Sequence, residues 1–218
     1  LLVSGYWDGQ DEARHVASKI EGKLKDGFDL NQIAVLVRAG FQTREFEERF
    51  LAIGLPYRVV GTRFYERAEI RDAMAYLRLI NQPADDLAFE RIINTPKRGL
   101  GPATLQIIYL LARARNIPLL AAAGALAESD ELKPQARRTL IAFCARIAGW
   151  CKQKDTLVPA EFLQVVLDES GYTEMWQKDK APDAPGRLEN LKELVSAIEG
   201  FDTLGGFLEH ISLVMDNE

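Results

Sequence analysis

The spacing of hydrophobic positions changes character at about residue 67, which divides the chain into two regions. In the first region, helical spacing alternates with continuous apolar runs that are rich in β-branched residues, such as "QIAVLV". Runs of this kind are typical of buried strands, and a strand, a helix and a second strand within thirty residues predict a βαβ unit. The expected elements are a helix at 10–25, a strand at 32–37, a helix from 43 to 54 and a strand at 56–60.

After residue 67 only helical spacing remains. The sequence therefore predicts an α/β fold class for residues 1–85, followed by an all-α domain at 86–218. Two strands are too few for an independent sheet, and the chain does not begin with Met, so we expect it to be a piece of a longer protein. Helices are expected at 67–80, 85–93, 102–115, 118–127, 133–152, 158–169, 187–199 and 203–215.

The composition is that of an ordinary globular protein. Hydrophobic residues make up 47% of the chain, no apolar stretch approaches the ~18 residues of a membrane span, and there is no secretory signal. Cys144 and Cys151 lie seven residues apart in one predicted helix, too far for a disulfide between them. We therefore expect a cytoplasmic protein without a membrane segment, and we expect no metal site because both histidines are isolated in sequence.

Charge is distributed unevenly along the chain. The net charge is -5, but residues 91–154 contain eleven Lys and Arg against three acids, and residues 91–127 contain no carboxylate at all. A solvated helix face normally mixes both signs, so this basic segment favours a polyanionic partner such as nucleic acid. Chance clustering of charge is the alternative interpretation.

The peptide "TPKRGLGPATL" at 95–105 lies inside this basic segment. One predicted helix ends before it and another begins at Pro102, which predicts a helix-hairpin-helix motif around Gly99-Leu100-Gly101. Glycines leave main-chain N–H groups accessible, and a helix N-terminus attracts anions, so a DNA phosphate is expected at this loop. The predicted DNA-binding residues are Lys97, Arg98, Gly99, Leu100, Gly101 and Thr104, with Leu100 as an inward anchor. An ordinary turn between two helices is the alternative.

Arg38 directly follows the first apolar run, at the carboxyl end of the expected strand. Open α/β sheets bind ligands at this edge, so Arg38 is a candidate for contact with a phosphate. No Walker A motif is present, and we expect the chain to be inactive as an ATPase on its own.

Two stretches together, "IAVLVRAGFQTREFEERFLAIGLPYRVVGTRFYERAEIRDAMAYLRLI" and "NTPKRGLGPATL", resemble the UvrD/PcrA/Rep family of superfamily 1 DNA helicases. The resemblance implies that residues 1–85 are the first part of a RecA-like subdomain of the P-loop NTPase type, called 2A, and that 86–218 are the helical subdomain 2B. It further implies an ATP-dependent 3′-5′ DNA helicase as the parent protein, with ATP and Mg²⁺ as cofactors, a DNA junction and the remaining helicase domains as partners, and a role such as DNA repair.

The fourth helicase motif of that family aligns with Val37-Arg38-Ala39-Gly40-Phe41-Gln42-Thr43-Arg44. This match implies that Arg38 contacts the γ-phosphate of ATP as a catalytic residue, and that Gln42 also binds ATP. The family has Tyr where this chain has Val37, which puts stacking on adenine at that position in question.

Two other functions remain open. The chain could be a stand-alone structure-specific DNA-binding module without ATPase domains. It could also be a protein-interaction domain, since Leu140, Cys144, Ile147 and Cys151 form an apolar stripe at helical spacing.

Overall fold

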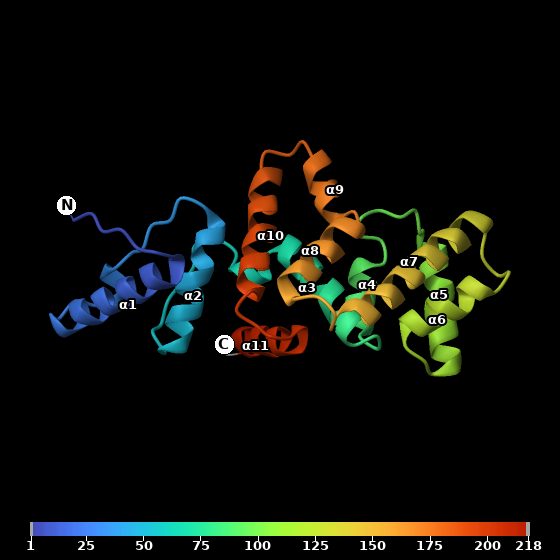
Figure 1. The fold of residues 1–218 in the computed structure, drawn as a ribbon, viewed down its shortest axis with the longest axis horizontal. Coiled ribbons are helices and arrows are strands. Elements are labelled where there is room, and N and C mark those ends of the chain that lie inside the picture. The colour runs from blue at the N-terminus through green and yellow to red at the C-terminus, as the bar shows by residue number, and fades with distance from the viewer. Residues whose placement is uncertain (1, 217–218) are drawn as a thin grey trace. The chain divides into compact units, whose positions relative to one another are not determined.

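The structure, a computed structural model, describes residues 2–216 (Figure 1). Every regular element within these residues is a helix, and none is a strand, so the predicted α/β fold class is wrong and the described chain is all-α. The α-helices are α1 (Gly9–Lys25), α2 (Thr43–Ala52), α3 (Ala68–Asn81), α4 (Asp86–Ile92), α5 (Pro102–Arg115), α6 (Leu119–Glu128), α7 (Pro134–Gln153), α8 (Pro159–Glu169), α9 (Tyr172–Lys178), α10 (Ala184–Ile198) and α11 (Leu204–Asp216). Short 3-10 turns occur at Leu30–Gln32, Gly40–Gln42 and Phe64–Glu66.

Neither of the two segments predicted as strands, 32–37 and 56–60, is part of a strand in the described chain. Residues 33–37 and 55–59 have no hydrogen-bonded neighbour strand anywhere in residues 2–216. A strand is completed by a ladder of hydrogen bonds to a second strand, and local sequence cannot supply that partner. Leu36 is 92% exposed, whereas Ile33, Leu55 and Tyr57 are half-buried and pack against the small core of the first unit.

Contacts divide the described chain into two compact units. The first contains the residues up to Arg67 together with those from Leu213 onward, and the second contains Ala68–Ser212. The assignment of residues 1–85 and 86–218 to two helicase subdomains stays a prediction.

The first unit is built around the packing of α1 against α2. The Asp8 side chain accepts a hydrogen bond from the Asp11 amide and so caps the N-terminus of α1. The apolar faces of the two helices then meet in a small core. Its buried members are Ala13, Ala17, Ile20, Phe46 and Phe50.

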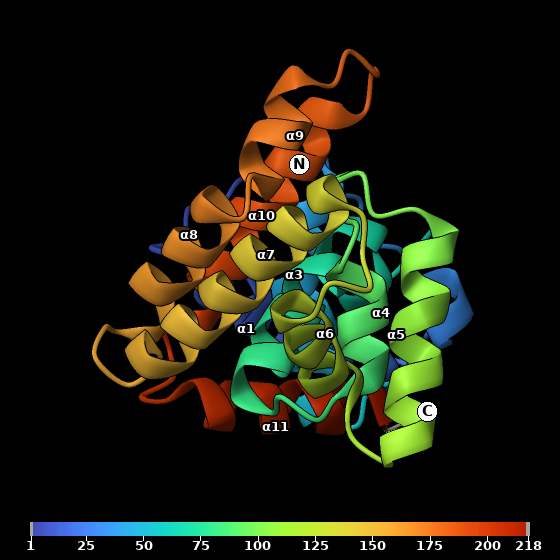
Figure 2. The same ribbon diagram turned by 90° about the vertical axis from the view of Figure 1, so that its right-hand side faces the viewer.

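The second unit is organised around α3, which packs against α4, α7, α8 and α10 and lies among them in Figure 2. The helix "AEIRDAMAYLRLIN" buries nearly every apolar position and also Tyr76, because neighbouring helices cover most of its circumference. The ring of Tyr76 lies 6.1 Å from that of Trp150 on α7 and 6.3 Å from that of Tyr172 on α9, measured between ring centroids.

A buried polar network fixes α10 to the start of α3. The carboxylate of Glu69 accepts a hydrogen bond from Asn190 Nδ2 at 2.6 Å and one from Arg187 Nη1 at 3.3 Å. Glu69 and Asn190 are both buried. A buried carboxylate is tolerated only when it is paired in this way, so the stretch "GRLENLKELVSAI" specifies how α10 docks.

Candidate nucleic-acid interface

The hairpin loop between α4 and α5 follows the geometry that its glycines permit. Gly99 has a φ of +74°, a left-handed conformation that favours glycine, and Gly101 is extended at the N-cap of α5. Pro102 occupies the first turn of α5, where a missing N–H costs nothing. Leu100 between the glycines is 1% exposed, as the predicted inward anchor requires.

The loop presents main-chain donors without partners. Within residues 2–216, the amides of Gly99, Leu100 and Gly101 make no hydrogen bond, whereas the Gly101 carbonyl accepts from the Thr104 amide at 3.0 Å. Both glycines are exposed, and the space where a side chain of either would begin is empty to 4 Å. Unpaired donors at a helix N-terminus form an electropositive site that suits a phosphate oxygen.

Arg98 is directed into the protein. Its Nη1 donates to the carbonyl of Ile92 at 2.7 Å and lies within 3.1–3.3 Å of three further carbonyl oxygens, while Nη2 donates to the Tyr76 hydroxyl at 2.5 Å. The guanidinium also lies 5.2 Å from the ring centroid of Phe143. The three further carbonyls belong to Ile93, Thr95 and Pro96. Arg98 thus holds the loop to α3 and α7.

The Asn94 side chain bridges two main-chain groups of the loop. Its Oδ1 accepts from the Arg98 amide at 2.8 Å, and its Nδ2 donates to the Leu100 carbonyl at 3.1 Å. The Tyr76 hydroxyl donates to the Thr95 carbonyl at 2.5 Å. Burial raises the pKa of this hydroxyl, while the Arg98 guanidinium acts in the opposite direction, so it stays protonated and able to donate. No local sequence pattern predicts this role for Asn94 or Tyr76.

Lys97 and Thr104 flank the loop amides. Lys97 is exposed, and its ammonium has no partner within residues 2–216. Thr104 is half-buried in the first turn of α5, and its hydroxyl makes no hydrogen bond in the same range. Both polar groups are free to meet an anion at the loop.

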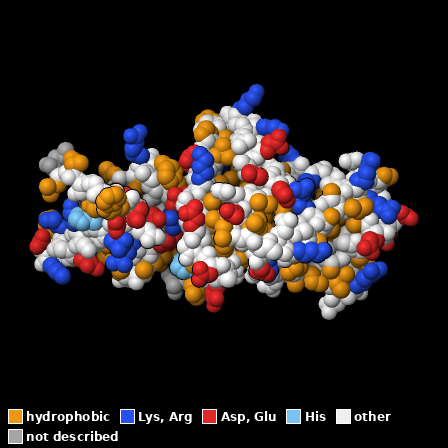
Figure 3. Space-filling view, viewed as in Figure 1, with side chains coloured by type: hydrophobic (Ala, Val, Ile, Leu, Met, Phe, Trp, Pro, Cys, Tyr) orange, Lys and Arg blue, Asp and Glu red, His pale blue; other side chains and the backbone are white. Residues whose placement is uncertain are grey.

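The basic segment at 91–154 is only partly neutralised. Three of its cations pair with carboxylates: Arg91 with Asp72 at 2.6 Å, Arg137 with Asp130 at 2.5 Å, and Arg146 with Glu169 at 3.4 Å. Five cations are exposed and have no partner in the described part of the chain. They are Lys97, Arg113, Arg115, Lys133 and Lys152. Figure 3 shows Lys and Arg side chains on the part of the second unit that carries α5, α6 and α7.

The second predicted site is the turn that carries Arg38 in the first unit. Gln42 Oε1 accepts from the amides of Arg38 and Ala39, both at 3.0 Å, and so fixes the turn. The Arg38 side chain is exposed, and its guanidinium has no partner within residues 2–216. Arg38 is therefore available to a phosphate, whereas the Gln42 oxygen is already used to shape the turn.

The apolar stripe on α7 is part of the core. Leu140 and Ile147 are buried, and burial raises the pKa of the Cys144 thiol to about 11. Both cysteines are free thiols. The stripe therefore offers no open face to a partner helix.

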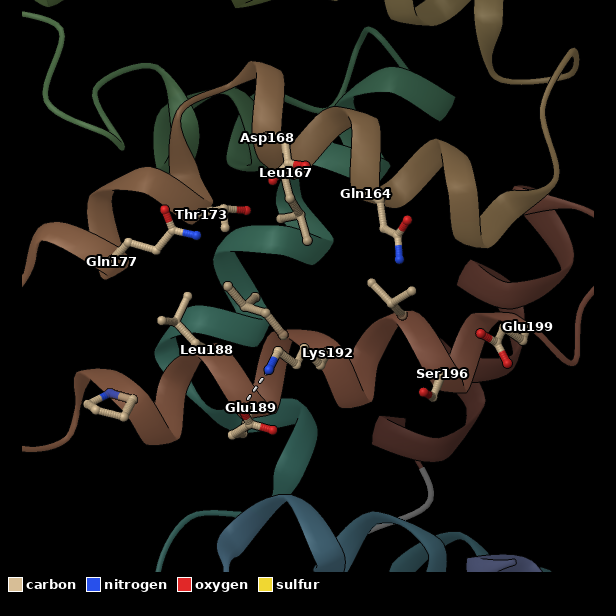
Figure 4. A pocket seen from close by; sticks show the side chains of 13 residues that line it. Gln164, Leu167, Asp168, Thr173, Gln177, Leu188, Glu189, Lys192, Ser196 and Glu199 are labelled. Carbon is tan, nitrogen blue, oxygen red and sulfur yellow. Dashed lines mark hydrogen bonds and ion pairs between the residues drawn. The ribbon is translucent and has the colours of Figure 1, made fainter.

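A cavity of about 550 Å³ lies between α8, α9 and α10 (Figure 4). Leu188 and Leu167 contribute apolar side chains to its lining, and Gln164, Gln177 and Glu189 contribute polar ones. None of the predicted site residues lines it. Sequence periodicity predicts α8 and α10 but not the space between them.

The described residues contain neither a candidate metal site nor a single membrane-spanning helix. No group of three or more His, Cys, Asp or Glu side chains could hold a metal ion among residues 2–216. In the same range no single helix is long and apolar enough to cross a membrane, and α5 with α6 meets that test only as a pair bent by 108°.

The sequence of the chain matches a known protein family. The model of the UvrD-like helicase C-terminal domain matches residues 3–123, and the chain belongs to this family. The resemblance to the UvrD/PcrA/Rep helicases that the sequence predicts is thereby confirmed.

Several relatives of the chain are named as DNA helicases. A probable DNA helicase II homolog of Rickettsia felis is 44% identical over the whole chain, which covers 34% of that relative. DNA helicase II of Haemophilus influenzae is 41% identical, and the ATP-dependent DNA helicase PcrA of Staphylococcus epidermidis is 35% identical, each over 95% of this chain and 30% of the relative. The chain thus spans about a third of the length of the curated relatives it matches.

Proposed function

We propose that this chain is the duplex-contacting part of an ATP-dependent 3′-5′ DNA helicase, and that its hairpin loop binds a phosphate of the DNA backbone. The observation that carries the proposal is the pair of exposed, unpaired amides at Gly99 and Gly101, placed at the N-terminus of α5 in a segment without carboxylates. Its partners are a junction of single-stranded and duplex DNA and the other helicase domains of a longer, cytoplasmic protein.

The predicted DNA-binding residues divide into two kinds. Gly99 and Gly101 would bind the phosphate through their amides, with Lys97 and Thr104 beside it. Leu100 and Arg98 would hold the loop in shape instead of contacting DNA, because Leu100 is buried and the Arg98 guanidinium is bound to carbonyl oxygens. Such contacts position a duplex without reading its sequence.

The Arg38 turn would serve ATP hydrolysis in the longer protein. Its free, exposed guanidinium fits a γ-phosphate, whose charge it would stabilise in the transition state. ATP and Mg²⁺ would be held mainly by other parts of that protein, and Gln42 would contribute by shaping the turn.

Salt-dependent binding of the chain to DNA tests the proposal. We expect the affinity for a 20-base-pair duplex with a 3′ single-stranded tail, measured by fluorescence anisotropy, to fall with salt at a log-log slope of about -0.9 for each neutralised phosphate. An affinity that does not change between 50 and 300 mM salt would overturn it.

Gly101→Ala tests the loop itself. Gly101 has a φ of -76° and a ψ of 168°, which any residue adopts, so alanine should change the stability by less than about 0.5 kcal/mol. Its methyl group would occupy the space proposed for the phosphate, so we expect about tenfold weaker binding, equivalent to about 1.4 kcal/mol. Lys180→Ala, which removes an exposed cation outside the basic segment, is the control and should bind nearly as wild type.

A further inference from the structure

Arg67 lies outside the turn that carries Arg38 and makes a hydrogen bond to the main chain of that turn. Nη2 of Arg67 donates to the carbonyl of Gly40 at 3.3 Å. The guanidinium lies so close that a β-carbon on Gly40 would be 2.6 Å from Nη2 and 2.8 Å from Cζ of Arg67. Glycine at position 40 is therefore what allows Arg67 to reach the main chain of the turn.

The Gly40 carbonyl is held in place because it accepts hydrogen bonds from more than one side chain. It also accepts from the Thr43 hydroxyl at 2.9 Å, at the start of α2. On the other side of Gly40, Gln42 Oε1 binds the amides of Arg38 and Ala39. A shift of Gly40 would consequently move the backbone that presents the Arg38 side chain.

Arg67 is itself anchored by the 3-10 turn Phe64–Glu66. Phe64 and Tyr65 are buried, the Phe64 amide donates to Glu47 Oε1 at 3.4 Å, and the Tyr65 hydroxyl donates to Glu48 Oε1 at 2.7 Å. The backbone leading into Arg67 is therefore tied to α2 at two places.

The Arg67 contact is costly for the fold. Its Nε is buried and has no hydrogen-bond partner in the described residues, and an unpaired buried donor costs about 1–3 kcal/mol. Arg67 is also the last residue of the first unit, because the second unit begins with Ala68 and α3. The guanidinium also acts on the buried Glu47 carboxyl, whose pKa is raised by burial and lowered, to a smaller extent, by Arg67. Its contact with the Gly40 carbonyl is made although Nε stays unpaired, which fits a role in positioning the Arg38 turn.

We propose that Arg67 is a positioning residue that holds the Arg38 turn through Gly40. This inference rests on the proposed role of Arg38 in ATP hydrolysis. Arg67 does not touch the nucleotide, so its loss should misplace Arg38 without removing a binding contact. A misplacement on the order of 1 Å can cost up to about a hundredfold in rate.

The test is steady-state ATP hydrolysis by the full-length protein that carries this chain. We expect Arg67→Ala to lower kcat by about tenfold or more and to change the KM for ATP by less than about twofold. Gly40→Ala should have the same effect, because its methyl group displaces the guanidinium, and the double variant should be no worse than either single variant. Arg58→Ala is the control, since Arg58 is an exposed cation without a partner in residues 2–216.

The Arg38→Ala background separates the two proposals. We expect Arg38→Ala to lower kcat, and adding Arg67→Ala to it should have no further effect if Arg67 acts through Arg38. If Arg38→Ala keeps the wild-type kcat, the proposed role of Arg38 fails. If Arg38→Ala lowers kcat but Arg67→Ala does not, or if the two losses multiply, only the positioning role of Arg67 is overturned.

Discussion

Replacing Arg98 by alanine should destabilise the second unit, because this side chain links three elements. Its Nη1 binds the carbonyl at the end of α4, its Nη2 binds Tyr76 on α3, and its guanidinium lies 5.2 Å from the ring centroid of Phe143 on α7. Truncation would leave these carbonyls and the Tyr76 hydroxyl short of a partner.

The magnitude follows from the number of independent bonds. The four carbonyl contacts share one nitrogen, Nη1, so we count them as one charge-assisted hydrogen bond and the bond from Nη2 to Tyr76 as a second. Each such bond contributes about 1.5–3 kcal/mol. Because Arg98 is partly exposed, we take the lower limit and expect a loss of about 3 kcal/mol in the free energy of unfolding.

Urea unfolding followed by tryptophan fluorescence measures this loss. Trp150 lies 6.1 Å from Tyr76, ring to ring, and reports on the second unit, whereas Trp7 is 97% exposed in the first. The experiment is therefore done in a Trp7→Phe background, so that only Trp150 and Trp176 contribute. Arg98→Lys should recover about half of the loss, since an ammonium can replace one of the two bonds but not both.

An unfolding free energy within about 0.5 kcal/mol of the parent would refute this reasoning. It would mean that the guanidinium lies in solvent, where an exposed side chain contributes little. The inward role of Arg98 would then have to be abandoned.

Three further predictions concern buried groups. Burial raises the pKa of the Glu47 carboxyl, so the first unit should lose stability as the pH rises above 4.5 through this raised pKa, and Glu47→Gln should remove that dependence in urea unfolding between pH 5 and 8. The Cys144 thiol, with its pKa raised by burial to about 11, should be alkylated by iodoacetamide at pH 8 about a hundredfold more slowly than a free thiol, and a rate equal to that of glutathione would contradict this. Asn190→Ala should cost about 3 kcal/mol in thermal unfolding, because the buried carboxylate of Glu69 loses its shortest hydrogen bond, and an unchanged melting temperature would rule that out.

Helices were the part of the fold that sequence periodicity could predict. The expected helix at 102–115 coincides with α5, and most others agree to within a few residues, because apolar spacing and the flanking Gly and Pro residues are local signals. Helix α9 at Tyr172–Lys178 was missed, since seven residues are too few to show a period.

The strands could not be predicted correctly from local pattern. The run at 33–37 is rich in β-branched residues, which favour a strand, but a strand also depends on a distant partner, and the described chain contains no strand.

The candidate site, too, could be predicted only where it depends on residues close in sequence. The sequence located the glycine loop and the buried Leu100, because turn geometry and burial follow from local residue types. It could not show that the Arg98 guanidinium turns inward, since that depends on Tyr76 and Phe143, which lie far away in sequence. A cation beside an anion-binding turn can serve the ligand or the turn, and only the surrounding fold distinguishes the two.

The main-chain amides of the hairpin loop are proposed to receive a phosphate of duplex DNA. Titrating the ¹⁵N-labelled chain with a short duplex and following the amide signals in two-dimensional NMR tests it most directly. We expect the signals of Gly99, Leu100 and Gly101 to shift together to saturation, and to return when the salt concentration is raised. DNA binding that leaves these three signals in place while others move would contradict the account.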